Sequence, residues 1–148
     1  MELSCRVGAE IAGAPADLVN IVKRYGHCIG MAFQITDDIL DFTADESILG
    51  KPTGSDISQG IITLPAMYAL RFSPERNELR WLLSTPERIR QELERGLEIV
   101  RRSGGIEFSY DLALRYIKKA QQVLIRLPES DSRQAMINLA DFVLQRNS

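Results

Sequence analysis

Apolar side chains recur every three or four residues between Asp17 and Phe42, and no proline interrupts them. This spacing places them on one face of a helix, which at about 1.5 Å per residue would be roughly 40 Å long. Gly26 and Gly30 lie four residues apart inside it. Because each glycine costs about 1 kcal/mol relative to alanine in a helix, the pair predicts the close approach of a neighbouring helix. A chain with this segment must fold as helices packed around it.

The rest of the chain also has helical periodicity. We expect helices over 63–71, 73–83, 85–102 and 108–127, and a last one from 131 or 132 to 144. The triplets 73–75 and 85–87 share one start signal, a hydroxyl, a proline and an acid. No alternating strand pattern or repeat is present. The predicted fold class is all-α, and 148 residues with 45% hydrophobic content predict one domain, 1–148.

Charge and composition exclude several classes of protein. A net charge of −2, a pI near 5.5 and no basic stretch argue against a nucleic-acid partner. One histidine excludes multi-histidine metal sites, and two cysteines cannot form a disulfide framework. No apolar stretch approaches the roughly 20 residues that span a bilayer, and no signal peptide is evident at residue 1. We therefore predict a soluble protein without a transmembrane segment, located in the cytoplasm.

Three carboxylates near the end of the long helix are candidates for chemistry. Asp37 and Asp41 are four residues apart on one helical face, and Asp38 lies about 100° around it. Such a group repels itself unless a cation is present, and Mg²⁺ prefers carboxylate oxygens. The alternative is that these acids are ordinary surface charges. Their apolar neighbours and their position at the unfavourable end of the helix dipole leave the two interpretations evenly balanced on the residues alone.

A loop rich in glycine and polar residues follows the carboxylates. It contains Lys51 between Gly50 and Gly54, which is not the spacing of a Walker loop. The Lys51 ammonium would suit a phosphate held by a metal ion. Taken alone, the segment is equally typical of a surface loop.

Together, three blocks resemble the trans-polyprenyl diphosphate synthases. The blocks are residues 30–42, GMAFQITDDILDF, residues 49–57, LGKPTGSDI, and residues 59–65, QGIITLP. They resemble the second aspartate-rich motif of that family and the lysine loop behind it, and the likeness extends over the whole chain, in the manner of a heptaprenyl or octaprenyl synthase. The resemblance implies an all-α isoprenoid-synthase bundle and a prenyltransferase that condenses isopentenyl diphosphate with an allylic prenyl diphosphate.

The resemblance also assigns roles to individual residues. It implies that Asp37, Asp38 and Asp41 are ligands of Mg²⁺, the expected cofactor, or partners of its water ligands. It implies that Lys51 is catalytic, because its contact with the diphosphate stabilises the leaving group. Substrate-binding roles are implied for Phe33 and Gln34, beside the allylic chain, for Lys51 and for Asp56.

The chain departs from the family pattern in length. It resembles only the C-terminal half of a synthase, and no other Asp-Asp-x-x-Asp is present. Three hypotheses follow: part of an active prenyltransferase whose other half is separate or absent, a catalytically incomplete subunit that binds a partner synthase, or an inert fragment. We expect a homo- or hetero-oligomer joined through helices, and an apolar face that the absent helices would cover.

The remaining conspicuous residues have simpler interpretations. We expect His27 to be a packed histidine and Cys5 and Cys28 to be buried thiols. Trp81 is expected to be a core or interface anchor. The charged segment 91–102 is expected to form a solvated amphipathic face.

Overall fold

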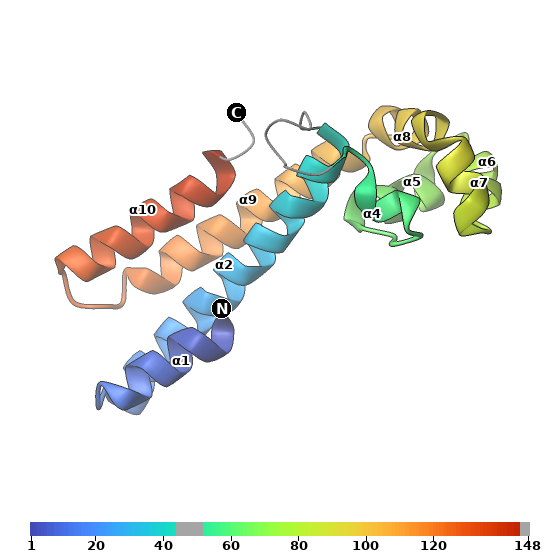
Figure 1. Ribbon diagram of the computed structural model, residues 1–148. Helices are drawn as coiled ribbons and strands as arrows, with labels where there is room; N and C mark the ends of the chain where they lie inside the picture. Colours follow the sequence, from blue (N-terminus) through green and yellow to red (C-terminus); the bar gives the residue numbers. More distant parts are fainter. Residues whose placement is uncertain (44–51, 146–148) are drawn as a thin grey trace. The chain divides into compact units, whose positions relative to one another are not determined.

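The computed structural model describes residues 1–43 and 52–145, in which every regular element is a helix (Figure 1). The all-α prediction is therefore confirmed. The described chain divides into two compact units, one formed by residues 1–36 and 112–148 and the other by residues 37–111. The long helix α2 (Ala16–Thr43) and helix α9 (Gly105–Leu124) contribute residues to both units.

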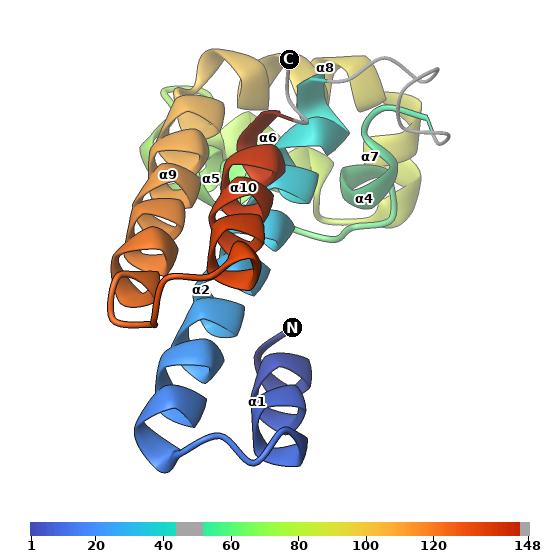
Figure 2. The ribbon, with the colours of Figure 1, turned by 90° about the vertical axis from the view of Figure 1, so that its left-hand side faces the viewer.

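Unit 1 packs α1 (Glu2–Ile11), the first part of α2, the second part of α9, and α10 (Asp131–Gln145). Figures 1 and 2 show α9 and α10 side by side along α2. The Tyr25 hydroxyl donates a 2.8 Å hydrogen bond to the Met136 carbonyl oxygen. Burial raises the pKa of Tyr25 to about 12. The buried residues of this core are Tyr25, Cys28, Ile29, Ala32, Ile117, Ala120, Leu124, Ala140 and Val143.

The two glycines of α2 admit α1 to close contact. A Cβ atom built on Gly26 would lie 2.7 Å from the Cys5 Sγ and 3.0 Å from the Met1 carbonyl oxygen. At Gly30 it would lie 3.4 Å from the Met1 Cβ. The predicted close approach of a neighbouring helix is confirmed, and that neighbour is α1. Helix α1 itself was not predicted, because it buries none of its residues and has no side-chain cap at its start.

Unit 2 is a cluster of short helices beside the end of α2. They are α4 (Ser55–Ser58), α5 (Leu64–Phe72), α6 (Arg76–Leu82), α7 (Pro86–Gln91) and α8 (Leu93–Arg102). Their apolar faces meet in one core with the last turns of α2. Its buried members are Phe42, Ile57, Ala66, Ala69, Leu79, Leu82, Ile89, Leu97, Ile99 and Val100.

The two hydroxyl-proline-acid triplets behave differently. At Thr85 the prediction is confirmed, since its Oγ1 accepts a 3.4 Å hydrogen bond from the Arg88 N–H and Pro86 begins α7. At Ser73 the prediction is wrong, because α6 begins only at Arg76. The Ser73 Oγ accepts from the Glu75 N–H at 3.1 Å, so it stabilises a turn ahead of the helix.

The expected helix over 85–102 is interrupted at Glu92, where φ is −117° and ψ is 36°. A Cβ on Gly96 would lie 2.6 Å from the Ile89 Cδ1. The missing side chain at Gly96 therefore leaves room for Ile89 of α7 to pack against α8. The helix expected over 108–127 instead runs from Gly105 to Leu124. At Gly105 a Cβ would lie 2.5 Å from the Pro65 carbonyl oxygen, which explains why a glycine opens α9.

Helix α1 presents an apolar stripe to solvent. Leu3, Val7 and Ile11 are four residues apart and are 70%, 39% and 83% exposed. This is an uncovered apolar face of the kind expected from the sequence. Within residues 1–43 and 52–145, no helix combines the length and apolarity needed to cross a membrane.

Candidate functional site

The last turns of α2 carry the three predicted carboxylates, all within unit 2. Asp37 and Asp38 are half-buried, whereas Asp41 is fully buried. Phe42, the next residue of α2, is also fully buried and belongs to the unit 2 core. The structure thus exposes two carboxylates in part and encloses the third.

Asp41 joins α2 to the segment that contains Asp56. The Asp41 Oδ2 accepts a 3.1 Å hydrogen bond from the Asp56 N–H. The Asp41 carbonyl oxygen accepts from the Gly54 N–H at 2.7 Å. Two members of the predicted set are therefore brought together, and the Asp41 carboxylate has an evident structural task in addition to any role with a ligand.

Gly54 makes this contact possible. Its φ of +76° belongs to the left-handed region, which favours glycine, and a Cβ there would lie 2.9 Å from the Leu97 Cδ2. In the sequence, Gly54 was recognised only as part of a loop. The signal that could have identified it is a glycine directly ahead of a possible helix start, Ser55-Asp56.

Asp38 contacts the start of α5. Its Oδ2 accepts a 3.4 Å hydrogen bond from the Leu64 N–H, which belongs to the first residue of that helix. The first N–H groups of a helix have no partner inside it and carry partial positive charge, so a carboxylate is favourable there. The Asp38 and Asp41 carboxylates therefore both accept hydrogen bonds from backbone N–H groups.

Arg101, which lies 59 positions from Phe42 in the sequence, forms a hydrogen bond to the C-terminal end of α2. Its Nε donates a 2.9 Å hydrogen bond to the Phe42 carbonyl oxygen, one of the last carbonyls of the helix. Arg101 belongs to the charged segment 91–102, for which the sequence predicts a solvated face. It is exposed, but it also serves the end of α2, which no local pattern in the sequence indicates.

The other predicted substrate-binding residues precede the carboxylates on α2 or lie outside the described residues. Phe33 and Gln34 lie on α2 within unit 1, where Phe33 packs against the unit 1 core and Gln34 is exposed. Lys51, the predicted catalytic residue, lies outside the described residues. Its role stays a prediction.

No group of three or more His, Cys, Asp or Glu side chains is arranged to share one metal ion within residues 1–43 and 52–145. Successive positions on a helix point about 100° apart, which separates the Asp37 and Asp38 side chains. The assignment of Asp37, Asp38 and Asp41 to a metal therefore stays a prediction.

Three simpler interpretations can be compared with the structure. The prediction for His27 is wrong, since its side chain is 51% exposed and its Nδ1 lies 3.0 Å from the Glu2 Oε2. Cys28 is buried and Cys5 is half-buried, and burial raises the pKa of both thiols. Trp81 is 56% exposed, with the Arg88 guanidinium 4.8 Å from its ring centroid, so it is not a core residue.

The charged face of 91–102 is confirmed as exposed and contains a network around Arg95. This guanidinium contacts the carboxylates of Glu75 at 2.6 Å, Glu78 at 2.8 Å and Glu98 at 3.0 Å. Hydrogen bonds from Arg95 lower the pKa of Glu78 and Glu98. The network fastens α6 to α8 at the surface.

The family model "Polyprenyl synthetase" matches residues 1–100, so the chain belongs to the polyprenyl synthetase family. Heptaprenyl diphosphate synthase component 2 of Geobacillus stearothermophilus is 44% identical over 144 residues, which is 97% of this chain and 44% of that protein. The short chain isoprenyl diphosphate synthase of Methanothermobacter thermautotrophicus is 38% identical, over 95% of this chain and 43% of that one.

Solved structures agree on the fold. Heptaprenyl diphosphate synthase from Staphylococcus aureus matches 99% of this chain and 46% of its own, with a TM-score of 0.89 and 33% identity. Geranylgeranyl pyrophosphate synthase from Corynebacterium glutamicum, in complex with calcium and isoprenyl diphosphate, matches 97% of this chain and 45% of its own, with a TM-score of 0.83 and 38% identity. The chain has the all-α terpenoid-synthase fold and spans a little under half the length of these relatives.

Proposed function

We propose that this chain forms part of a cytoplasmic prenyltransferase that condenses isopentenyl diphosphate with an allylic prenyl diphosphate in a Mg²⁺-dependent reaction. The observation that carries the proposal is the placement of Asp37, Asp38 and Asp41 on the last turns of α2 in a member of the polyprenyl synthetase family. The cytoplasmic location is supported by two cysteines that form no disulfide.

The donor chemistry suits Mg²⁺. The ion takes hard oxygen ligands, is commonly held by one or two carboxylates, and keeps water and phosphate oxygens in its other positions. Asp37 and Asp38 are half-buried, and their side chains point about 100° apart on the helix. A given Mg²⁺ ion would therefore be bound by one of these carboxylates, and not by both. The calcium and isoprenyl diphosphate in the structure from Corynebacterium glutamicum support a cation and a diphosphate as joint ligands of such a site.

When bound, Mg²⁺ would supply Lewis-acid stabilisation of the diphosphate that leaves the allylic substrate. Asp37 and Asp38 would each bind a Mg²⁺ ion or one of its water ligands, and Asp41 would keep residues 54–56 attached to α2 through the Asp56 N–H. The Lys51 ammonium would contact the leaving diphosphate. Asp56 would be a further acidic group near the same site. Phe33 and Gln34 would contact the allylic chain, with Phe33 helping to exclude water.

In the proposed condensation, one carbon–oxygen bond breaks and one carbon–carbon bond forms. The allylic carbon–oxygen bond breaks, and its electron pair leaves with the diphosphate. The double bond of isopentenyl diphosphate supplies the pair for the new carbon–carbon bond, and a proton then passes to the released diphosphate, which restores a double bond.

A second candidate is a catalytically incomplete subunit that acts with a partner synthase, in a homo- or hetero-oligomer. One observation favours it: the relatives from Geobacillus stearothermophilus and Bacillus subtilis both carry the words "component 2" in their names. The exposed apolar stripe on α1 is compatible with such an assembly.

The deciding experiment measures two properties of the purified chain and its Asp37→Ala variant. One is the binding of inorganic diphosphate with and without Mg²⁺, by calorimetry. The other is the incorporation of labelled isopentenyl diphosphate with farnesyl diphosphate present. We expect Mg²⁺-dependent binding that falls at least about tenfold in Asp37→Ala, because a carboxylate ligand is lost. Asp111→Ala, which removes an exposed carboxylate on α9, is the matched control.

The two measurements separate the candidates. Turnover that disappears in Asp37→Ala supports an active synthase. Binding without turnover supports the incomplete subunit. Diphosphate binding that is unaffected by Mg²⁺ or by Asp37→Ala would contradict the proposed metal site.

A further inference from the structure

A hollow of about 350 Å³ lies among α1, α2 and α9 within unit 1. Three of the side chains that line it are permanent cations, Lys23 and Arg24 on α2 and Lys119 on α9. Glu2 of α1 is the one carboxylate among its lining residues. The hollow therefore carries net positive charge, although the whole chain carries a net charge of −2.

Two of these cations have no carboxylate partner within the described ranges. Glu2 lies 3.5 Å from the Lys23 Nζ and 3.0 Å from the His27 Nδ1. The hydrogen bond to His27, and then the charge of Lys23, lower the pKa of Glu2. Its negative charge is thus occupied on one side of the hollow. Among the residues that the structure describes, Arg24 and Lys119 form no ion pair, which leaves their charges available to a ligand.

Arg24 and Lys119 line the same hollow as the buried thiol of Cys28. Cys28 lines the hollow and is 8% exposed. Burial raises its pKa, and the charges of Lys119 and Arg24 partly offset that rise. Two cations from different helices therefore line the same hollow as this sulfur atom. Lys119 also approaches the Tyr116 ring, with 5.5 Å between its Nζ and the ring centroid.

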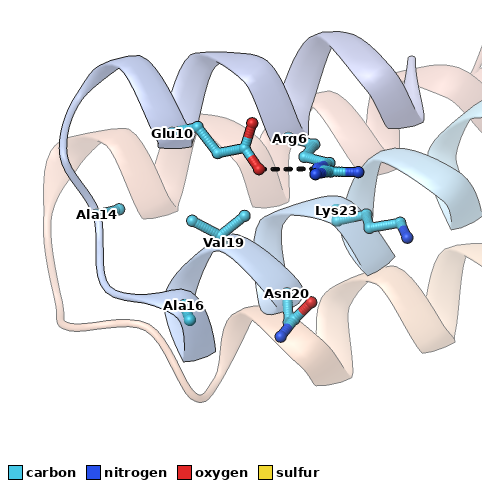
Figure 3. A pocket seen from close by; sticks show the side chains of 7 residues that line it. All are labelled: Arg6, Glu10, Ala14, Ala16, Val19, Asn20 and Lys23. Atoms are coloured by element: carbon cyan, nitrogen blue, oxygen red, sulfur yellow. Dashed lines mark hydrogen bonds and ion pairs between the residues drawn. The ribbon is translucent and has the colours of Figure 1, made fainter.

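A neighbouring hollow between α1 and α2 provides a contrast (Figure 3). It has a volume of about 490 Å³ and shares Lys23 with the first hollow. There the Arg6 Nε lies 2.8 Å from the Glu10 Oε1, as the dashed line in Figure 3 shows. Because Arg6 is paired with Glu10, this second hollow lacks the pair of unpaired cations that lines the hollow beside Cys28.

We propose that the hollow beside Cys28 binds the phosphate group of a small anion, with Arg24 and Lys119 as its charged contacts. A guanidinium offers paired N–H donors to phosphate oxygens, and an ammonium adds a compact point charge. His27 supplies a further ring nitrogen at the rim, and Tyr116 gives the hollow an apolar wall that suits an organic ester. This inference is independent of the proposed function, since it uses none of the aspartates of α2 and requires no metal.

The test is calorimetry on the full chain with three probes: inorganic phosphate, inorganic diphosphate and phenyl phosphate. EDTA is present throughout, so that binding through a metal ion cannot contribute. We expect saturable binding at one site that weakens about tenfold in Lys119→Gln and in Arg24→Gln, the loss typical of one charge-assisted hydrogen bond. Lys118→Gln is the matched control, because Lys118 is an exposed neighbour on α9 that does not line the hollow.

The arms of the experiment also distinguish the sources of the phosphate. Equal affinity for all three probes supports a site for the free anion, and tighter binding of phenyl phosphate supports a site for an ester. Absence of saturable binding in EDTA, or an equal loss in Lys118→Gln, overturns the proposal. Because Mg²⁺ is excluded, neither result bears on the metal site of α2.

Alkylation of the two cysteines, resolved by mass spectrometry, gives a second readout. Phosphate should slow the labelling of Cys28, which lines the hollow, and leave Cys5, which does not, as the internal reference. Equal effects on both thiols would count against the site.

Discussion

Helix α2 carries two charged regions that are built in different ways. Its last turns hold acids that accept hydrogen bonds from backbone N–H groups, Asp38 from Leu64 and Asp41 from Asp56. Earlier on the same helix, Lys23 and Arg24 belong to a hollow whose cations lie on long side chains. The acids are therefore part of what holds unit 2 together. Of the cations that line the hollow, Lys23 lies 3.5 Å from Glu2 of α1, whereas Arg24 and Lys119 form no ion pair to another element among the described residues.

The largest expected effect of breaking this pattern is at Asp41. Asp41→Ala should lower the free energy of unfolding by about 3 kcal/mol, because the Asp56 N–H loses its acceptor in a buried setting. Urea unfolding followed by fluorescence of Trp81, the single tryptophan, reports on unit 2 directly. Asp41→Asn keeps an acceptor oxygen and should recover part of the loss. Equal losses in both variants would mean that the charge, and not the hydrogen bond, is what matters.

A smaller effect is expected from the glycine that admits this contact. Gly54→Ala should cost about 2 kcal/mol, since alanine is strained at φ +76° and its methyl group would meet Leu97. Gly60→Ala is the matched control, with φ +80° and nothing within 4 Å of the added Cβ, and should cost about 1 kcal/mol. The same urea experiment measures both. If Gly60→Ala is as costly as Gly54→Ala, the contact with Leu97 contributes nothing.

The smallest effect is expected in the basic hollow. Arg24→Gln and Lys119→Gln should change the free energy of unfolding by less than about 0.5 kcal/mol, because neither cation forms an ion pair among the described residues. Thermal unfolding followed by circular dichroism provides the measurement. A loss as large as that of Asp41→Ala would show that these cations, like the acids, are structural.

Much of the fold could be predicted because long helices are recognisable from apolar residues that recur every three or four positions. Helix α2 was expected over 17–42 and runs from Ala16 to Thr43, and α10 was expected from 131 or 132 and begins at Asp131. The short helices of unit 2 were less predictable. The use of the Ser73 hydroxyl in a turn, the break at Glu92 and the early start of α9 at Gly105 depend on tertiary contacts or on local alternatives of similar energy.

The candidate site was predictable in its residue types and not in its contacts. The spacing of Asp37, Asp38 and Asp41 indicated three carboxylates on α2, and the structure places them there. The burial of Asp41 and its hydrogen bond to Asp56, fifteen positions away, could not be read from spacing. The error at His27 has the same origin, because its partner Glu2 lies on a helix that the sequence pattern did not reveal.

The hydrogen bond between Tyr25 and Met136 joins residues 111 positions apart, and this separation affects the order of folding. Unit 2 is continuous in the sequence, whereas unit 1 is assembled from two stretches that flank it. During synthesis, at about 5–20 residues per second, α1 and the first part of α2 emerge well before α10. If unit 2 folds first, it shortens the flexible loop that unit 1 must close and lowers the entropy lost in closing it. The slow step for unit 1 is then the arrival of its own C-terminal helices.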